Sequence, residues 1–291
     1  MKARFVDTEK AYYPVTMICR VLQFSPKSYY AWRARTRVPS RRQIETERLL
    51  GAVRAAFERG RGTYGSPRVH AELQATGIPV GLNRVAKLMR VMGLCVRPRK
   101  GYWVSTTDSN PEHDVAPNML DRDFDATAPN QKWVGDVTFI DTAEGWLYLA
   151  TMIDLYNREI VGWAVGDRND QNLTRQCLDM ALEGCTSPDQ LLHHTDRGST
   201  YTAGNYRDAL NERGITCSMS RKGNCWANAV AESCFASIKK DLVHRRRFES
   251  RQEATEAIFE YVERFYNRIR RHSSLNYMTP VEFREYNTAT A

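Results

Sequence analysis

The chain lacks any hydrophobic run long enough to cross a membrane. Its longest nearly apolar stretch, Trp146 to Ile153, is far shorter than the roughly 20 residues that a membrane-spanning helix needs. The first ten residues, MKARFVDTEK, carry charges and do not resemble a secretory signal. The sequence therefore argues against a membrane or secreted protein, and we expect a cytoplasmic one.

The chain also lacks cysteine pairs at metal-binding spacing. Its seven cysteines are odd in number, and no two of them are spaced as CxxC. This pattern argues against a disulfide framework and against a zinc ribbon. Hydrophobic residues make up 42% and charged residues 26% of the 291 residues, which is too apolar for a disordered chain. The length predicts two or three domains.

Negative charge is scarce in the first hundred residues. Residues 1–100 hold 21 Lys and Arg against 6 Asp and Glu, residues 101–130 hold 1 against 6, residues 131–220 hold 7 against 13, and residues 221–291 hold 13 against 9. Basic flanks favour a polyanionic partner, because neutralising phosphates releases condensed counterions. A solvated charged surface is the alternative, and we favour nucleic acid.

The basic N-terminal part is expected to be helical. Within residues 14–35 the pattern predicts two short helices at helix-turn-helix spacing, because Ser25 can cap the second and Pro26 suits its first position. A further helix is expected over residues 45–59 and is ended by Gly60.

Residues that typically begin and end a helix then occur a second time. Ser66-Pro67 opens a helix that reaches about Gln74, and a second helix is expected from a cap at Asn83 to Met92. On this second helix Arg84, Lys87 and Arg90 share one face. A basic face of this kind suits a recognition helix in a DNA major groove, and an ordinary amphipathic surface helix is the alternative.

Residues 100–130 are polar and acidic and have neither helical nor strand periodicity, so we expect a linker. Beyond it, alternating apolar residues predict three consecutive antiparallel strands, after which helices and strands alternate. The final segment is expected to hold a long helix from about Asn228 into the basic run at 244–248, and then a helix capped by Ser250 and Glu253.

Three carboxylates occur at unusual positions in the predicted strands and helices. Asp136 interrupts an apolar strand, Asp196 ends another strand, and Glu232 lies one turn into a helix. Oxygen ligands of this kind favour Mg²⁺ or Mn²⁺ over zinc. Two such ions about 4 Å apart would activate an attacking oxygen and stabilise a leaving one. For each carboxylate the alternative is a cap or a surface charge.

Two adjacent histidines are also candidate ligands. Because neighbouring residues on a strand point to opposite faces, at least one of His193 and His194 is expected to be structural.

The segments that carry these residues resemble a known family. WVGDVTFI, HHTDRGSTY, AVAESCFASIKKDL and FYNRIRRHSSLNYMTPVEF are similar, in that order, to the catalytic half of the IS-three family of insertion-sequence transposases, the downstream-frame product whose core resembles retroviral integrases. YGSPRVHAEL and NRVAKLMRVMGL resemble the helix-turn-helix segment of that family. The resemblance covers nearly the whole chain.

The resemblance implies a multi-domain fold with an all-α helix-turn-helix N-terminal region and an α/β ribonuclease H-like catalytic core with a mixed five-stranded sheet. We expect the following division: residues 1–40 as a small helix-turn-helix region, 41–100 as a helix-turn-helix DNA-binding domain, 101–130 as a linker, 131–250 as the catalytic core and 251–291 as a C-terminal helical extension.

The resemblance also implies the activity and the partners. A DDE transposase, which is a polynucleotidyl transferase, binds the terminal inverted repeats of its element and uses two Mg²⁺ ions, or Mn²⁺ in their place, for DNA strand cleavage and strand transfer. Its catalytic and metal-binding triad here would be Asp136, Asp196 and Glu232. Its partners would be the element ends and target DNA, a second copy of the chain, and an upstream-frame protein or fusion. It would work in the bacterial cytoplasm, at the nucleoid.

We expect eight basic residues to contact DNA. They are Arg84, Lys87 and Arg90 for recognition, Lys239 and Lys240 near the active site, and Arg245, Arg246 and Arg247 for phosphates.

The chain departs from the family at one position. Where the family commonly has Trp-Asp-Asn-Ala before the glutamate, this chain has Trp226-Ala227-Asn228-Ala229, so a charge near the metal site is lost. Two alternatives to an active transposase therefore stay open. One is a DNA-binding protein of the same origin with a weakened catalytic core, and the other is a ribonuclease H-like nuclease.

Overall fold

A computed structural model describes residues 1–37, 39–96, 116–185, 190–202, 204–220 and 229–290. The helices of the N-terminal part are α1 (Lys2–Glu9), α2 (Val15–Val21), α3 (Pro26–Arg37), α4 (Arg41–Arg59), α5 (Ser66–Ala75) and α6 (Leu82–Val91). The strands are β1 (Lys132–Thr142), β2 (Gly145–Asp154), β3 (Ile160–Gly166), β4 (Leu192–Thr195) and β5 (Thr216–Met219). The other elements are α7 (Gln171–Glu183), α8 (Ser199–Thr202), α9 (Gly204–Asn211), α10 (Ala229–Asp241), the 3₁₀ turn η3 (Val243–Arg245), α11 (Arg251–Phe259), the π-helix η4 (Glu260–Tyr266), the 3₁₀ turn η5 (Ser273–Leu275) and α12 (Pro280–Thr290).

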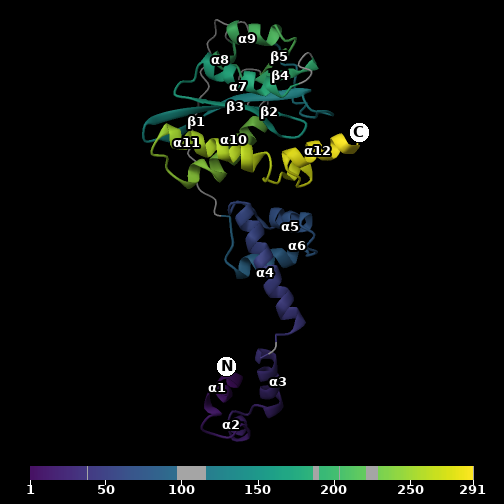
Figure 1. Ribbon diagram of the computed structural model, residues 1–291, viewed down its shortest axis with the longest axis vertical. Coiled ribbons are helices and arrows are strands. Elements are labelled where there is room, and N and C mark those ends of the chain that lie inside the picture. The colour runs from purple at the N-terminus through teal and green to yellow at the C-terminus, as the bar shows by residue number, and fades with distance from the viewer. Residues whose placement is uncertain (38, 97–115, 186–189, 203, 221–228, 291) are drawn as a thin grey trace.

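Helices α1 to α3 form a small unit at the end of the molecule far from the sheet (Figure 1). The two predicted helices are α2 and α3, and α3 begins at Pro26 as the sequence indicates. Helix α1 was not predicted. It contributes Val6 to a small core that also contains Ile18 and Cys19 of α2 and Tyr29 of α3.

Helices α4 to α6 form a second helical unit. The prediction that α4 begins near residue 45 was wrong, because the hydroxyl of Ser40 accepts a hydrogen bond from the Gln43 N–H, while the Gln43 amide oxygen accepts one from the Ser40 N–H, so that the helix is capped earlier. The cap predicted at Asn83 was also wrong. Gly81 holds that position in an extended conformation, and Asn83 lies inside α6.

The five strands form one mixed sheet in the order β3-β2-β1-β4-β5. Strands β1, β2 and β3 pair antiparallel, and β4 and β5 add parallel to β1. The predicted meander is therefore confirmed. Because a parallel pair needs a crossover, α7 connects β3 to β4, and α8 and α9 connect β4 to β5.

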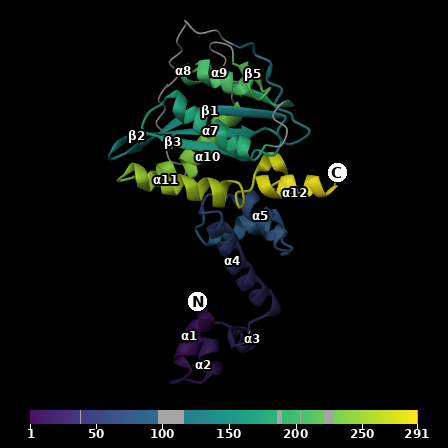
Figure 2. The ribbon, with the colours of Figure 1, turned by 45° about the horizontal axis from the view of Figure 1, so that its top comes forward.

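Helices cover both faces of the sheet (Figures 1 and 2). Since side chains alternate along a strand, Leu149 and Ile153 of β2 join a core with α10 and α11, whereas Ala150 and Met152 join a core with α7 and α9. Residues 116–130 form neither helix nor strand, yet Leu120 among them is buried.

The C-terminal part differs from the prediction in two places. Helix α10 ends at Asp241 and does not continue into the basic run, because Phe248 turns back to form a β-bridge with Thr142 and is buried. Ser250 caps α11 as predicted, but the Glu253 carboxylate accepts its hydrogen bond from the Glu249 N–H, and the helix widens to a π-helix after Phe259. Within the described ranges no helix is long and apolar enough to span a membrane.

Candidate active site

Asp136 and Asp196 come from neighbouring parallel strands. The register between β1 and β4 pairs Trp133 with His193 and Val134 with His194. Continuing this register by two residues sets Asp136 beside Asp196, which follows directly after the last residue of β4. The carboxyl ends of parallel strands are where open α/β sheets bind ligands, so the two carboxylates share the edge at which chemistry is expected.

Local backbone contacts hold each aspartate. One carboxylate oxygen of Asp136 accepts a hydrogen bond from the Val137 N–H at 2.8 Å. One oxygen of Asp196 accepts from the Gly198 N–H at 2.9 Å. A Cβ atom at Gly198 would itself lie 2.9 Å from that oxygen, so a larger residue here would push the Asp196 carboxylate out of this position. The Asp196-Arg197-Gly198 sequence thereby fixes the direction of its carboxylate.

Helix α10 brings two further charges to this edge. Glu232 is exposed in the first turn of α10, and Lys239 lies half-buried two turns later. The Lys239 ammonium is 5.1 Å from the centre of the Phe139 ring of β1, where ring and cation attract each other. Lys240, the other predicted lysine, is exposed.

The pKa of Asp136 shows that these groups act on one another. Burial and then the charge of Asp196 raise the pKa of Asp136 to about 8, with a smaller contribution from Glu232. The Val137 N–H and the Lys239 charge oppose this rise in pKa. Burial also raises the pKa of Asp196. Without a cation nearby, Asp136 therefore favours its protonated form near neutral pH.

The oxygen-only donor set has the chemistry of a site for a hard divalent cation. A bound cation would offset the repulsion that raises the pKa of Asp136. The three carboxylates are nevertheless not gathered as closely as the sequence predicted. Among the residues that the structure describes, no group of three or more His, Cys, Asp or Glu side chains is close enough to hold a metal ion. The two neighbouring aspartates have the oxygen chemistry that such an ion prefers, and exposed Glu232 does not complete a group of three with them.

The two adjacent histidines of β4 belong to the interior. His193 and His194 are both fully buried, and burial lowers their pKa values to about 3 and about 4. A ring nitrogen of His193 lies 2.8 Å from the Tyr206 hydroxyl, and one of His194 lies 2.8 Å from the Ser218 hydroxyl. Both imidazoles are therefore neutral packing residues.

The three predicted recognition residues are exposed on α6, opposite its buried apolar face. A guanidinium nitrogen of Arg84 lies 2.9 Å from a carboxylate oxygen of Glu45 on α4. Arg84 therefore helps to hold α4 against α6. Lys87 and Arg90 present their charges to solvent.

The predicted phosphate contacts Arg245, Arg246 and Arg247 are all exposed but are engaged differently. Arg245 donates hydrogen bonds to the carbonyls of Arg61 and Gly62 at 3.2 and 3.4 Å, so it reaches back to the helical unit of α4 to α6. The Arg246 guanidinium stacks 4.7 Å from the Phe248 ring centre.

Trp226, Ala227 and Asn228, which carry the departure from the family, lie outside the described residues.

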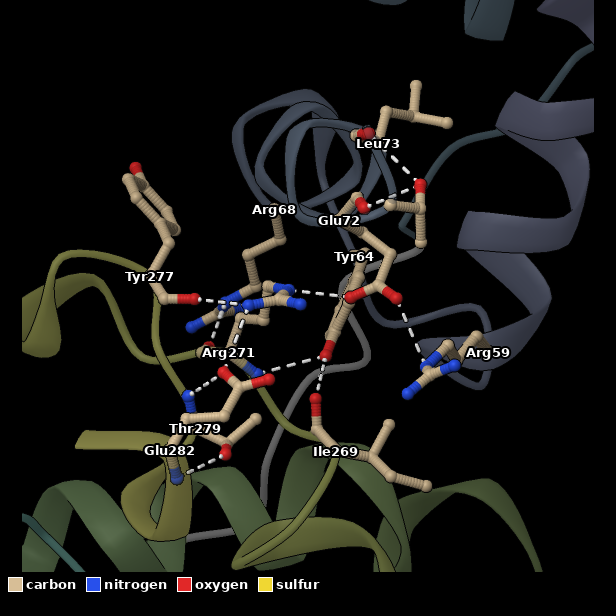
Figure 3. A network of polar contacts seen from close by, with 11 residues as sticks. Arg59, Tyr64, Arg68, Glu72, Leu73, Ile269, Arg271, Tyr277, Thr279 and Glu282 are labelled. Carbon is tan, nitrogen blue, oxygen red and sulfur yellow. Dashed lines mark hydrogen bonds and ion pairs between the residues drawn. The ribbon is translucent and has the colours of Figure 1, made fainter. Parts of the chain in front are cut away.

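Sequence reasoning missed a network of polar contacts between α4 to α6 and the segment after the π-helix (Figure 3). At its centre Arg271 contacts Glu72. The only local signal was the pair Arg270-Arg271 within an otherwise well-packed segment.

Comparisons with known proteins match this arrangement. Two models of the integrase core domain match residues 126–225 and 213–280, and a model of an HTH-like domain matches residues 45–102. The transposase InsF for insertion sequence IS3A of Escherichia coli strain K12 is 38% identical, over 99% of this chain and 100% of its own length. This chain belongs to the IS3 family of insertion-sequence transposases.

Other members are similar over comparable lengths. A 31 kDa protein of insertion element IS600 from Shigella sonnei is 45% identical over 92% of this chain and 97% of its own. The transposase for insertion sequence element IS904 from Lactococcus lactis is 41% identical over 87% of this chain and 99% of its own. Among solved structures, a chain of the simian T-cell lymphotropic virus intasome has a TM-score of 0.45 and 14% identity, over 74% of this chain and 69% of that one.

Family membership makes this transposase an enzyme of the polynucleotidyl transferase type. The predicted fold class, a helix-turn-helix region joined to an integrase core with a mixed five-stranded sheet, is confirmed. Its two kinds of domain bind DNA.

Proposed function

We propose that this transposase cleaves and joins DNA strands at the edge formed by β1 and β4, with Asp136, Asp196 and Glu232 as its catalytic and metal-binding residues. The observation that carries the proposal is the neighbouring position of Asp136 and Asp196 in the register of β1 and β4. Burial, and then the charge of Asp196, raise the pKa of Asp136 to about 8. Such a shift at a strand edge is typical of a functional site.

The two aspartates and Glu232 would hold two Mg²⁺ ions, or Mn²⁺ in their place. When bound, the ions would activate the attacking oxygen and stabilise the leaving oxygen of a phosphodiester. The role of the protein is to position the three carboxylates. The Gly198 N–H fixes the Asp196 carboxylate, and α10 has to bring Glu232 closer to the aspartates when DNA is bound.

Lys239 is proposed to contact DNA next to the scissile phosphate. It lies close enough to Asp136 to lower the pKa of that carboxyl, and burial lowers its own pKa. A half-buried ammonium at this place gains a partner when a phosphate enters. Exposed Lys240 would contribute only to general attraction of DNA.

The DNA contacts away from the active site are proposed to come from two regions. Lys87 and Arg90 on α6, with a smaller part for Arg84 because of its contact with Glu45, would bind the terminal inverted repeats. Arg246 and Arg247 would contact phosphates. Arg245 would do so less, because its guanidinium is engaged by two carbonyls.

We further propose that the transposase acts as at least a dimer, since it has to pair two DNA ends, and that an upstream-frame protein or fusion assists it. Its place of action would be the cytoplasm, at the bacterial nucleoid.

Incubation of the chain with labelled element-end DNA and Mg²⁺ tests the proposal. We expect a nick at the element end, followed by joining of the freed 3′-hydroxyl to target DNA, and loss of both with Asp196→Asn at unchanged DNA binding. Specific binding without any cutting would instead support a weakened DNA-binding protein. Cutting without joining would support a ribonuclease H-like nuclease.

A further inference from the structure

The helix-turn-helix unit is attached to the catalytic core through buried charges. A guanidinium nitrogen of Arg271 lies 2.6 Å from a carboxylate oxygen of Glu72 on α5, and their side chains are only 7% and 4% exposed. The other Glu72 oxygen lies 3.1 Å from Arg59 of α4. Arg271 also contacts Glu282 at 3.2 Å and the Tyr277 carbonyl at 2.9 Å (Figure 3). One guanidinium thereby joins α5 to the C-terminal segment.

Backbone contacts fix the same two segments. The Tyr64 hydroxyl donates to the Ile269 carbonyl at 2.8 Å and accepts from the Arg271 N–H at 2.9 Å. Arg68 donates to the Arg271 carbonyl at 2.9 Å. These bonds are directional and join main chain on the core side, so they define an orientation as well as a contact.

A second contact lies beside the first and resists rotation about it. The Arg61 guanidinium pairs with Glu260 and lies 4.3 Å from the centre of the Phe265 ring. Arg245 donates to the carbonyls of Arg61 and Gly62. Two separated contacts, with apolar packing continuous across both parts, leave little freedom for one part to swing against the other.

The neighbouring residue Arg270 makes its contacts inside the catalytic core. It lies 2.9 Å from the Asp241 carboxylate at the end of α10 and donates to Ser237 at 3.0 Å. Helix α10 carries Glu232 and Lys239. Arg270 therefore anchors α10 within the core, whereas Arg271 makes the contact with the helical unit of α4 to α6.

We propose that these contacts make the transposase a ruler, in which Arg271 and Glu72 are positioning residues that set the distance from the bases bound by α5 and α6 to the phosphate that is cut. This inference rests on the proposed function. A rigid connection fixes that distance, because the DNA-binding helices and the sheet that carries Asp136 and Asp196 move as one body. A hinged connection would let several phosphates reach the carboxylates.

The cut position on end-labelled DNA tests the ruler. Short insertions are placed between the footprinted bases and the element end, and the cut is mapped to the nucleotide. With the natural chain we expect the cut to follow the footprint at a constant distance. With Glu72→Ala and with Arg271→Ala we expect cuts at several adjacent phosphates while affinity for the end stays unchanged.

Arg270→Ala is the matched control, because Arg270 and Asp241 are also 7% and 4% exposed but lie within the core. It is expected to slow cutting and to keep a single cut position. Arg61→Ala, at the more exposed contact, supplies a milder variant if the buried changes prevent folding, and it is also expected to broaden the cut.

The outcomes separate the two proposals. A cut that stays at the element end despite the insertions, or a single cut position in Arg61→Ala and Arg271→Ala alike, refutes the ruler and leaves the proposed function intact. If the natural chain makes no cut at all, both fall.

Discussion

Asp136→Asn is expected to stabilise the metal-free protein at alkaline pH while removing its activity. In the folded chain the pKa of Asp136 is raised to about 8 from 3.8. Because the folded chain holds this proton more tightly than the unfolded chain, stability falls as the pH rises from about 4 to about 8. Asparagine does not titrate, so the variant escapes this loss. Asp196, whose pKa is also raised, adds to the effect in the natural chain.

The magnitude follows from the pKa. Each pH unit between the unfolded and the folded pKa changes the free energy of unfolding by about 1.4 kcal/mol. Between pH 5 and pH 8 the advantage of Asp136→Asn should therefore grow by up to about 4 kcal/mol. Solvent around this half-buried edge reduces the figure. For a core of this size, about 2 to 3 kcal/mol corresponds to a rise in Tm of roughly 5–10 °C.

Differential scanning calorimetry with EDTA at pH 5 and pH 8 measures this effect on the transition of the catalytic core. We expect a small advantage in Tm for Asp136→Asn at pH 5 and a clearly larger one at pH 8. Addition of Mg²⁺ should narrow the gap at pH 8 by stabilising the natural chain. A Tm difference that is the same at both pH values, or a less stable variant at pH 8, would refute the reasoning.

Three other substitutions test individual contacts. Lys239→Ala should slow strand cleavage about tenfold or more, which corresponds to about 1.4 kcal/mol in the activation barrier. Lys240→Ala, at the exposed neighbouring lysine, should leave the rate unchanged. Equal rates for the two variants would show that Lys239 has no role at the active site. In urea unfolding, Glu72→Ala should cost up to about 3 kcal/mol, because Arg271 loses its buried carboxylate partner and keeps only the more exposed Glu282. Replacing Glu72 and Arg271 together by apolar residues should recover much of this loss, and no recovery would argue against a buried pair. In filter binding, Lys87→Ala should reduce the salt slope of end affinity by about 1, and an unchanged slope would contradict a phosphate contact.

Local signals in the sequence predicted most elements of the fold. Alternation of apolar residues gave β1 to β3 and the turns between them, and Ser25-Pro26 gave the start of α3. The cap of α6 was misplaced because Gly81 and Asn83 are both suitable caps, and only the path of the preceding turn decides between them. The end of α10 was missed because it depends on Phe248 pairing with a strand residue far away in the chain.

The candidate site was predictable only as a set of residues. An aspartate inside an apolar strand and one after a strand are local patterns, so Asp136 and Asp196 could be chosen. The distance from Glu232 to them depends on how α10 packs on β1, which no spacing encodes. The contact between Glu72 and Arg271 joins residues 199 positions apart, and both are of a kind expected at the surface, so the pair Arg270-Arg271 alone could not indicate its partner.

A metal-specificity switch tests the central claim most directly. In Asp136→Cys a soft thiolate, which suits Mn²⁺ better than Mg²⁺, replaces a hard oxygen ligand. Strand transfer of end-bearing DNA by this variant should be lost in Mg²⁺ and partly restored in Mn²⁺. Transfer in Mg²⁺ at the rate of the natural chain would contradict the assignment of Asp136 as a metal ligand.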